Sequence, residues 1–223
     1  MYDLKTDLEE NIREIDVLLN NEEIQKCIYD SFNLGIKAYL KKESLNVGKQ
    51  ITTYPASKGI KRASEIGDAI CNSKEAEKLG IKTDIILTSH IPIIRIGKIA
   101  LTIKSLKTID DIYKCNSQYI KDYSRINKAL SPQTDMFLDN PQVELSLNSK
   151  YYGVLVYKIG QDNTISNMTF VFLNDKCDMI VHKVEVDLAK FRNSGEIGHE
   201  DPSTAHSITR EEKSLKDKIK LKA

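Results

Sequence analysis

The sequence contains no apolar run long enough to cross a bilayer, and its few cysteines and histidines are widely separated. Four cysteines occur without a Cys-x-x-Cys pair or a nearby histidine: Cys27, Cys71, Cys115 and Cys177. Structural zinc sites need closely spaced ligands, so we expect free buried thiols and no zinc. The four histidines are equally scattered, and we expect no ligand role for them.

The first sixteen residues are acidic and amphipathic, which is the opposite of a secretory signal peptide. We therefore expect a cytoplasmic protein without a membrane partner. The chain has 223 residues, of which 40% are hydrophobic and 29% charged, as in ordinary globular proteins. This length allows one domain with a sizeable core.

Charge is distributed unevenly along the chain, although the formal net charge is only +1. Residues 1–50 carry 7 Lys/Arg and 10 Asp/Glu, a net charge of −3, whereas residues 51–128 carry 14 and 8, a net charge of +6. Clustered lysines and arginines suit a polyanionic partner such as nucleic acid. A solvated basic face of an ordinary protein is an equally good explanation of this excess alone.

Apolar residues at three- and four-residue steps predict helices over 3–19, 22–40, 56–71 and 108–130. A short helix is expected after Asn72-Ser73-Lys74-Glu75, which resembles a capping box, and Gly80 should end it. Runs of β-branched and aliphatic residues predict strands at 84–87, 99–103, 151–159, 166–173 and 179–188. Together these elements predict an α/β fold with a mixed central sheet flanked by helices.

We predict a single domain over residues 1–192. It would comprise a helical hairpin (1–42), a core that carries the chemistry (56–130) and an antiparallel β-meander (151–190). Residues 193–223 are expected to form a polar loop and a charged C-terminal helix.

The segment from Lys82 to Lys107 is the strongest candidate for a site. We expect its two apolar strands to pair as a hairpin or near-hairpin, with a Pro/Gly-punctuated reversal between them. Such a pair would place the carboxylate of Asp84 a few ångströms from the ammonium of Lys104, at one edge of a sheet.

The order of these elements resembles the core of the PD-(D/E)XK nuclease superfamily. In that order a helix bears Glu, the next strand bears Asp, and a strand paired with it ends in x-x-Lys before another helix. The stretches TDIIL (83–87) and IALTIKSLK (99–107) are most similar to type II restriction endonucleases within that superfamily. The resemblance implies a restriction-endonuclease-like fold and catalytic roles for Asp84 and Lys104. Thr102 stands where these enzymes usually have a second acidic residue, so the resemblance assigns it to that catalytic position, although its side chain cannot supply a carboxylate.

The resemblance further implies Mg²⁺-dependent hydrolysis of phosphodiester bonds in double-stranded DNA. Mg²⁺ needs several oxygen ligands, which Asp84 alone does not supply. We expect Glu65 to be the second acidic ligand, and the carbonyl of Ile103 to contribute a neutral one. Other candidates for the second ligand are Asp68, Asp110 and Asp111. Lys104 would activate the attacking water or stabilise the transition state.

Four basic residues are candidates for contacts with DNA phosphates: Lys58, Lys61, Arg62 and Lys107. A restriction-type enzyme is expected to be a homodimer, since a two-fold protein reads a two-fold DNA site. Two alternatives remain open. One is another nuclease of DNA repair, recombination or phage origin. The other is a non-catalytic DNA-binding or structural protein that retains the fold and has lost the site at Thr102.

Overall fold

The computed structural model describes residues 4–45, 55–86, 91–114, 117–131 and 148–192. The chain divides into two compact units, Met1–Leu188 and Ala189–Ala223. Of the second unit only the end of α8 (Leu188–Arg192) is described, so the C-terminal helix expected after residue 193 lies outside the described residues. Among the described helices, none is long and apolar enough to span a membrane.

The first unit begins with four helices: α1 (Leu4–Leu19), α2 (Glu22–Leu45), α3 (Pro55–Cys71) and α4 (Lys74–Lys78). The expected break after Leu19 is confirmed. The side chain of Asn21 accepts hydrogen bonds from the backbone N–H groups of Glu23 and Ile24 and so caps α2. Ser73 likewise caps α4, and Gly80 follows that helix with a φ of +69°, which favours glycine.

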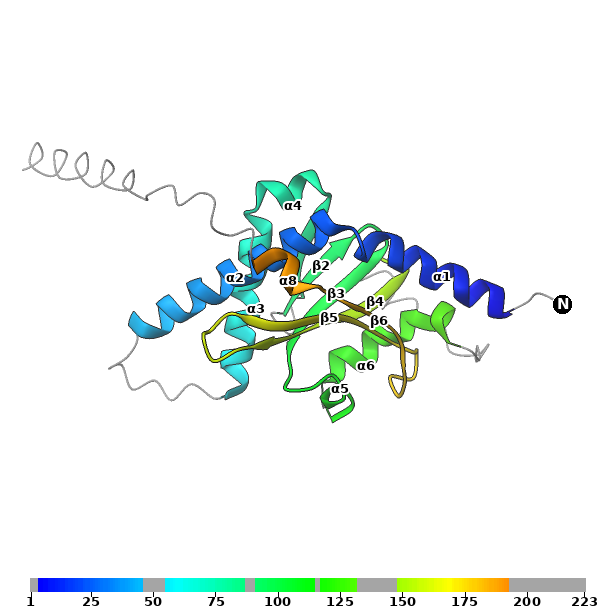
Figure 1. Ribbon diagram of the computed structural model, residues 1–223. Helices are drawn as coiled ribbons and strands as arrows, with labels where there is room; N and C mark the ends of the chain where they lie inside the picture. The colour runs from blue at the N-terminus through cyan, green and yellow to red at the C-terminus, as the bar shows by residue number, and fades with distance from the viewer. Residues whose placement is uncertain (1–3, 46–54, 87–90, 115–116, 132–147, 193–223) are drawn as a thin grey trace, which may run out of the picture. The chain divides into compact units, whose positions relative to one another are not determined.

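A six-stranded sheet forms the centre of the unit, with its strands in sequence order (Figure 1). The strands are β1 (Ile81–Ile86), β2 (Ile91–Ile96), β3 (Ile99–Ser105), β4 (Tyr151–Ile159), β5 (Ile165–Leu173) and β6 (Ile180–Glu185). Only β3 and β4 pair in parallel; every other pair is antiparallel. The α/β fold with a mixed sheet is therefore confirmed, as is the meander formed by the last three strands.

The expected hairpin between the strands of Asp84 and Lys104 is wrong, because β2 lies between β1 and β3. Pro92 and Gly97 argued against a strand here. However, pairing of β2 with β3 begins only at Ile93, so Pro92 is paired on its β1 side alone. A proline is tolerated where a strand has a free side. Gly97 makes the tight turn into β3 with a φ of +54°.

The expected helix over 108–130 is divided into α5 (Asp111–Lys114), α6 (Gln118–Ser124) and the 3-10 helix η1 (Arg125–Leu130). These short helices form the crossover that joins the parallel strands β3 and β4. Parallel neighbours require such a crossover because their connection must return to the same end of the sheet.

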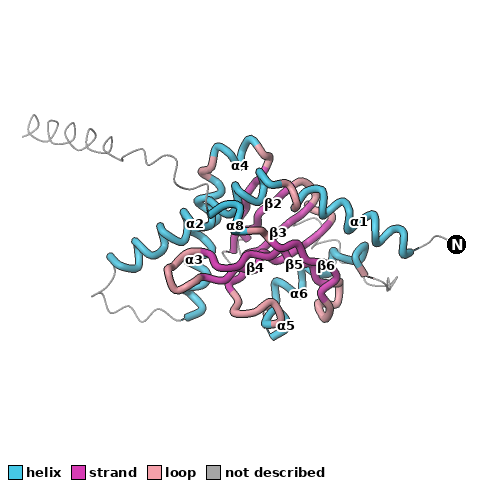
Figure 2. Tube along the Cα trace, viewed as in Figure 1, coloured by secondary structure: helices cyan, strands magenta, loops and turns pink. Residues whose placement is uncertain are grey.

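Helices cover the two faces of the sheet differently (Figure 2). Side chains alternate along a strand, so Ala100, Thr102 and Lys104 of β3 point to one face. Ala100 belongs to a buried cluster with Ile112, Ile120 and Ile126 of the crossover helices, and we call this side the α5–α6 face.

The opposite side, the α3 face, is covered by α2 and α3. The rings of Phe32 in α2 and Tyr157 in β4 meet edge to face at 5.4 Å. Gly67 of α3 lies directly against Pro92 of β2, where an added Cβ would come within 2.7 Å of the proline side chain. The sheet therefore separates the crossover helices from α2 and α3, whereas α1 reaches the crossover, where the side chain of Asn11 donates to the carbonyl of Ala129 at 3.0 Å.

The described cysteines are free thiols, but only Cys27 is buried as expected, whereas Cys177 is half-buried and Cys71 is exposed. Cys115 lies outside the described residues.

A fully buried amide ties the crossover to the sheet. The side chain of Asn127 in η1 donates to the carbonyls of Tyr152 and Leu173 at 2.8 and 2.7 Å, and accepts from the Tyr152 N–H at 2.8 Å. These three backbone groups lie at the ends of β4 and β5. Asn127 thus satisfies polar groups that water does not reach.

Replacing this amide by an apolar side chain of similar size should therefore destabilise the fold. We expect Asn127→Leu to lower the free energy of unfolding by about 3 kcal/mol, because three buried backbone groups lose their partner. A comparable change from an amide to leucine at an exposed turn residue, Gln161→Leu, should alter the free energy of unfolding by less than about 0.5 kcal/mol. Urea unfolding measures both values, and equal effects would contradict the assigned role.

Glu14 attaches α1 to the start of β4. Its carboxylate accepts hydrogen bonds from Lys98, Lys150 and the hydroxyl of Tyr151 at 2.5, 2.9 and 2.6 Å. Lys98 first, then Tyr151 and Lys150, lower the pKa of Glu14 from 4.5 to about 2. Because the folded-state pKa is lowered, this stabilisation is present above pH 4.5 and is lost as the pH falls towards 2.

We expect Glu14→Gln to lower the free energy of unfolding at pH 7 by about 1 kcal/mol, the scale of a well-formed surface ion pair. The loss of stability between pH 4.5 and 2 should become smaller in this variant, since its side chain does not titrate. Unfolding at stepped pH tests this, with Glu10→Gln on the exposed side of the same helix as the control. An unchanged acid profile in Glu14→Gln would contradict the assignment.

Candidate nucleic-acid interface

Three of the predicted catalytic residues share the α5–α6 face. Asp84 is in register with Ile93, and Ile93 with Thr102, so the three residues form one row across β1, β2 and β3. Lys104 lies two residues further along β3 on the same face. These three side chains therefore point to the same face of the sheet, with β2 between Asp84 and the other two. Neighbouring strands are about 4.8 Å apart, which puts the backbones of Asp84 and Thr102 about 10 Å apart.

Asp84 lies on the edge strand β1 with its side chain 55% exposed. Its carboxylate oxygen Oδ2 is 2.5 Å from Nε of Arg95 on β2. The strand that sequence analysis missed therefore supplies the cation next to Asp84. Lys104, which was expected in that role, makes its hydrogen bond elsewhere.

Thr102 is fully buried, with Oγ1 2.6 Å from the hydroxyl of Tyr152 on β4. Burial raises the pKa of Tyr152 well above its ordinary value, so the phenol stays neutral. Thr102 thus pairs two strands in the core, and its catalytic assignment is not supported. Tyr152 was not predicted as a partner of Thr102, because only the parallel register of β3 and β4 brings the two side chains together.

Lys104 is half-buried and is held by the crossover. Its Nζ donates to Oγ of Ser117, immediately before α6, at 2.9 Å and lies 5.9 Å from the centre of the Tyr119 ring. The side chain therefore leans towards α6, with its charge near the surface of the α5–α6 face.

Glu65 does not meet these residues. It lies on α3, on the opposite side of the sheet, and its carboxylate accepts a hydrogen bond from Lys42 of α2 at 2.5 Å. Asp68 is exposed on the same helix. The expected convergence of Glu65 with Asp84 and Lys104 is thus wrong, because sheet order and not sequence proximity decides which face a helix covers.

The remaining acidic candidates lie before and in α5. Asp111 accepts from the backbone N–H of Thr108 at 3.1 Å and from Lys114 at 3.0 Å, and chiefly Lys114 lowers its pKa. It is therefore a capping residue, while Asp110 is exposed in the preceding turn. Ile103, expected to offer its carbonyl, is buried in β3.

The proposed magnesium ligands do not fit the ion. Asp84 is engaged by Arg95, Glu65 lies behind the sheet, and Thr102 replaces a carboxylate with a buried hydroxyl. Throughout the described part of the chain, no three His, Cys, Asp or Glu side chains are grouped to hold a metal. No step of a metal-dependent reaction can be built on these residues.

The candidate DNA-binding residues also divide between the two faces. Lys58 and Lys61 are exposed on α3. Arg62 instead points inward, with its guanidinium 5.1 Å from the centre of the Tyr39 ring. It also forms a hydrogen bond with Tyr157, where burial raises the pKa and Arg62 partly offsets that rise. Arg62 therefore packs between α2 and the sheet and is not available to a phosphate. Lys107 is exposed just beyond β3.

A pocket of about 200 Å³ opens where the parallel strands β3 and β4 end. Lys107 and Thr108 contribute from the β3 side, and Lys158 from β4, with Asn167 from the neighbouring strand β5. Its other lining residues are Leu106, Ile109, Val156 and Tyr157. The backbone N–H of Leu106 donates to the carbonyl of Tyr157 at 3.1 Å, which holds the two strand ends together.

The lining of this pocket contains two lysines, an amide, a hydroxyl and no acidic residue. Lys104 lies next to it along β3, in register with Val156. Sequence analysis singled out Lys104 and Lys107 but missed Lys158 and Asn167. The strand prediction for 151–159 and 166–173 contained both residues, yet the register that aligns them came only from the structure.

No known protein family, curated protein or solved structure matches the chain. The function must therefore be inferred from the site itself.

Proposed function

We propose that the chain binds double-stranded DNA through its phosphates without cleaving it. The observation that carries the proposal is the pocket at the ends of β3 and β4, which is lined by Lys107, Lys158 and Asn167 and by no acidic residue. A phosphate oxygen accepts hydrogen bonds from ammonium, amide and hydroxyl groups, which are the polar groups present here.

The charges around the pocket support a polyanionic ligand. Within the described residues no carboxylate forms an ion pair with Lys107 or Lys158. Lys104 adds a third cation on the same face. Residues 51–128, which include β3, α5 and α6, also carry the basic excess of the sequence. Such clusters gain affinity for DNA by displacing its counterions.

Hydrolysis of DNA with Mg²⁺ remains a prediction from the resemblance to restriction endonucleases, and the geometry favours it less than binding alone. An enzyme of that type needs acidic ligands beside Asp84, whereas the structure gives Asp84 an arginine. The expected homodimer and cytoplasmic location likewise remain predictions.

The binding proposal predicts that removing the two pocket lysines weakens DNA binding. We expect Lys107→Ala with Lys158→Ala to raise the Kd for a fluorescent mixed-sequence duplex about tenfold at 0.1 M salt, and to reduce the slope of log Kd against log salt by about 2. Anisotropy titrations at several salt concentrations measure both effects.

The matched control removes two lysines from the α3 face, Lys58→Ala with Lys61→Ala, which should change the Kd less than twofold. An equal loss in both double variants would mean that only the overall charge matters. No binding by the unsubstituted protein would refute the proposal outright.

A cleavage assay separates binding from hydrolysis. We expect a long duplex to stay intact with the protein in Mg²⁺ or Mn²⁺, and Asp84→Ala to behave identically, because Asp84 pairs with Arg95 and not with a metal. Discrete fragments that disappear with EDTA and in Asp84→Ala would instead establish the nuclease. The shift in anisotropy shows in the same samples that DNA is bound.

A further inference from the structure

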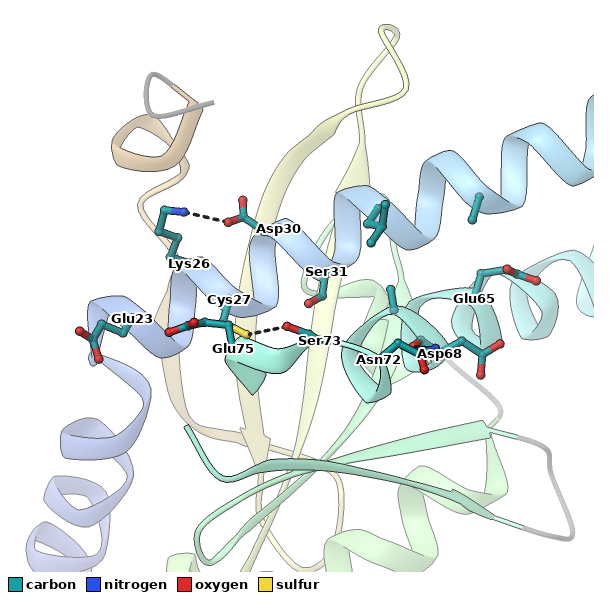
Figure 3. Close-up of a pocket in the computed structure, with 13 residues that line it drawn as sticks. Glu23, Lys26, Cys27, Asp30, Ser31, Glu65, Asp68, Asn72, Ser73 and Glu75 are labelled. Atoms are coloured by element: carbon teal, nitrogen blue, oxygen red, sulfur yellow. Dashed lines mark hydrogen bonds and ion pairs between the residues drawn. The ribbon is translucent and has the colours of Figure 1, made fainter. Parts of the chain in front are cut away.

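A second concave surface lies on the opposite side of the sheet from the proposed DNA pocket. It is a groove of about 580 Å³ between α2, α3 and α4 (Figure 3). Along α2 it is lined at three- and four-residue steps, by Glu23, Lys26, Cys27, Asp30, Ser31, Leu34 and Ala38. These residues form one face of the helix. The face spans sixteen residues, or about 22 Å at 1.5 Å per residue.

The rim of the groove is strongly acidic. Five carboxylates line it: Glu23, Asp30, Glu65, Asp68 and Glu75. The single lysine in the lining, Lys26, forms an ion pair with Asp30 at 2.9 Å, and two exposed lysines outside the lining, Lys42 and Lys78, pair with Glu65 and Glu75. Figure 3 shows Glu65 and Asp68 of α3 at one end, and Glu23 and Glu75 towards the other. Negative charge therefore flanks the groove along its length.

The floor of the groove is apolar and has room for side chains. Leu34 is 60% exposed, although it is a large aliphatic residue in the middle of a long helix. Ala38 and Ala69 lie beside it in the lining, with Cys27 further along α2. An exposed leucine in a groove that is also lined by alanines and rimmed by charge is typical of a surface that binds a partner.

We infer that this groove binds a basic amphipathic helix of a partner protein. The apolar side of such a helix would cover Leu34, Ala38 and Ala69, while its lysines and arginines would face the five carboxylates. A helix is recognised in such a groove through apolar side chains that it carries at steps of three and four residues, and the face of α2, about 22 Å long, extends over about four turns of such a helix.

Charge complementarity favours a basic helix in this groove over a second copy of the chain. Residues 1–50, which include α1 and α2, carry a net charge of −3, so two copies facing each other through this layer would repel. The inference is independent of DNA binding, because the groove belongs to the α3 face and the lysine pocket to the α5–α6 face.

The test uses a synthetic 18-residue peptide with capped ends, with leucines at helical spacing on one side and lysines on the other, added to the full-length protein. Its control peptide has the same composition in an order that removes the apolar side. Fluorescence anisotropy should give a Kd at least tenfold lower for the amphipathic peptide than for its control.

Two charge-reversed proteins then locate the site. Asp68→Lys with Glu75→Lys should weaken binding of the amphipathic peptide at least tenfold. Glu9→Lys with Glu10→Lys makes the same change in net charge on exposed positions of α1 outside the groove and should weaken it less than twofold. Leu34→Ser, at an exposed position, should weaken it about fivefold. Circular dichroism and thermal unfolding confirm that each variant is folded.

Three results would overturn the inference. Equal losses in the two charge-reversed proteins, or equal binding of the two peptides, would mean general attraction of lysines to an acidic protein. Unchanged binding in Leu34→Ser would remove the apolar floor from the site. Concentration-dependent dimers that Leu34→Asp abolishes, seen by light scattering, would show that a second copy occupies the groove.

Discussion

The parallel pairing of β3 with β4 constrains most of this structure. Parallel strands that are neighbours in a sheet need a long connection, and here it passes over one face as α5, α6 and η1. That crossover buries Ala100 and Tyr152 and draws Lys104 towards Ser117. The same pairing brings the carboxyl ends of β3 and β4 together, so lysines that are fifty-one residues apart in sequence, Lys107 and Lys158, line one pocket.

The sheet also acts as a barrier between two sets of charged residues. Lysines gather where the parallel strands end, whereas carboxylates gather in the groove between α2, α3 and α4. A lysine-lined pocket on one face of the sheet and an acidic groove on the other can hold two partners of opposite charge without competition between them. The proposed DNA site and the proposed helix-binding groove are consistent with such a division, in which one surface contacts nucleic acid and the other an associated protein.

The residues that resembled a nuclease site have structural partners instead. Arg95 neutralises Asp84, Tyr152 pairs with Thr102, and Lys42 holds Glu65 on the far side of the sheet. Each of these contacts satisfies a group that would otherwise be available for a metal or a substrate. The proposal of binding without cleavage depends on this set of contacts, and in the described residues no three His, Cys, Asp or Glu side chains are grouped to hold a metal.

Local features of the chain were sufficient to predict most of its elements. The 3.6-residue periodicity predicted α1, α2 and α3, and β-branched runs predicted the strands except β2, because helix periodicity and strand alternation depend on neighbouring residues alone. β2 was not predicted because it contains Pro92 and is followed by Gly97, and both residue types weaken a strand. Pro92 is tolerated because it is unpaired on the β3 side, and Gly97 because it makes the tight turn into β3. Thr102 and Lys104 lie on one face of β3 because side chains alternate along a strand, whereas their alignment with Asp84 depends on the register of β2 with both neighbouring strands.

Tertiary structure alone decided which of these side chains meet. The insertion of β2 separated Asp84 from Lys104, and the packing of α3 on the other face removed Glu65 from the site. The buried amide of Asn127, the Thr102–Tyr152 pair and the approach of Lys158 to Lys107 all join segments distant in sequence. Strand order and register determine such contacts, and these depend on the packing of the whole sheet rather than on any pattern within one segment.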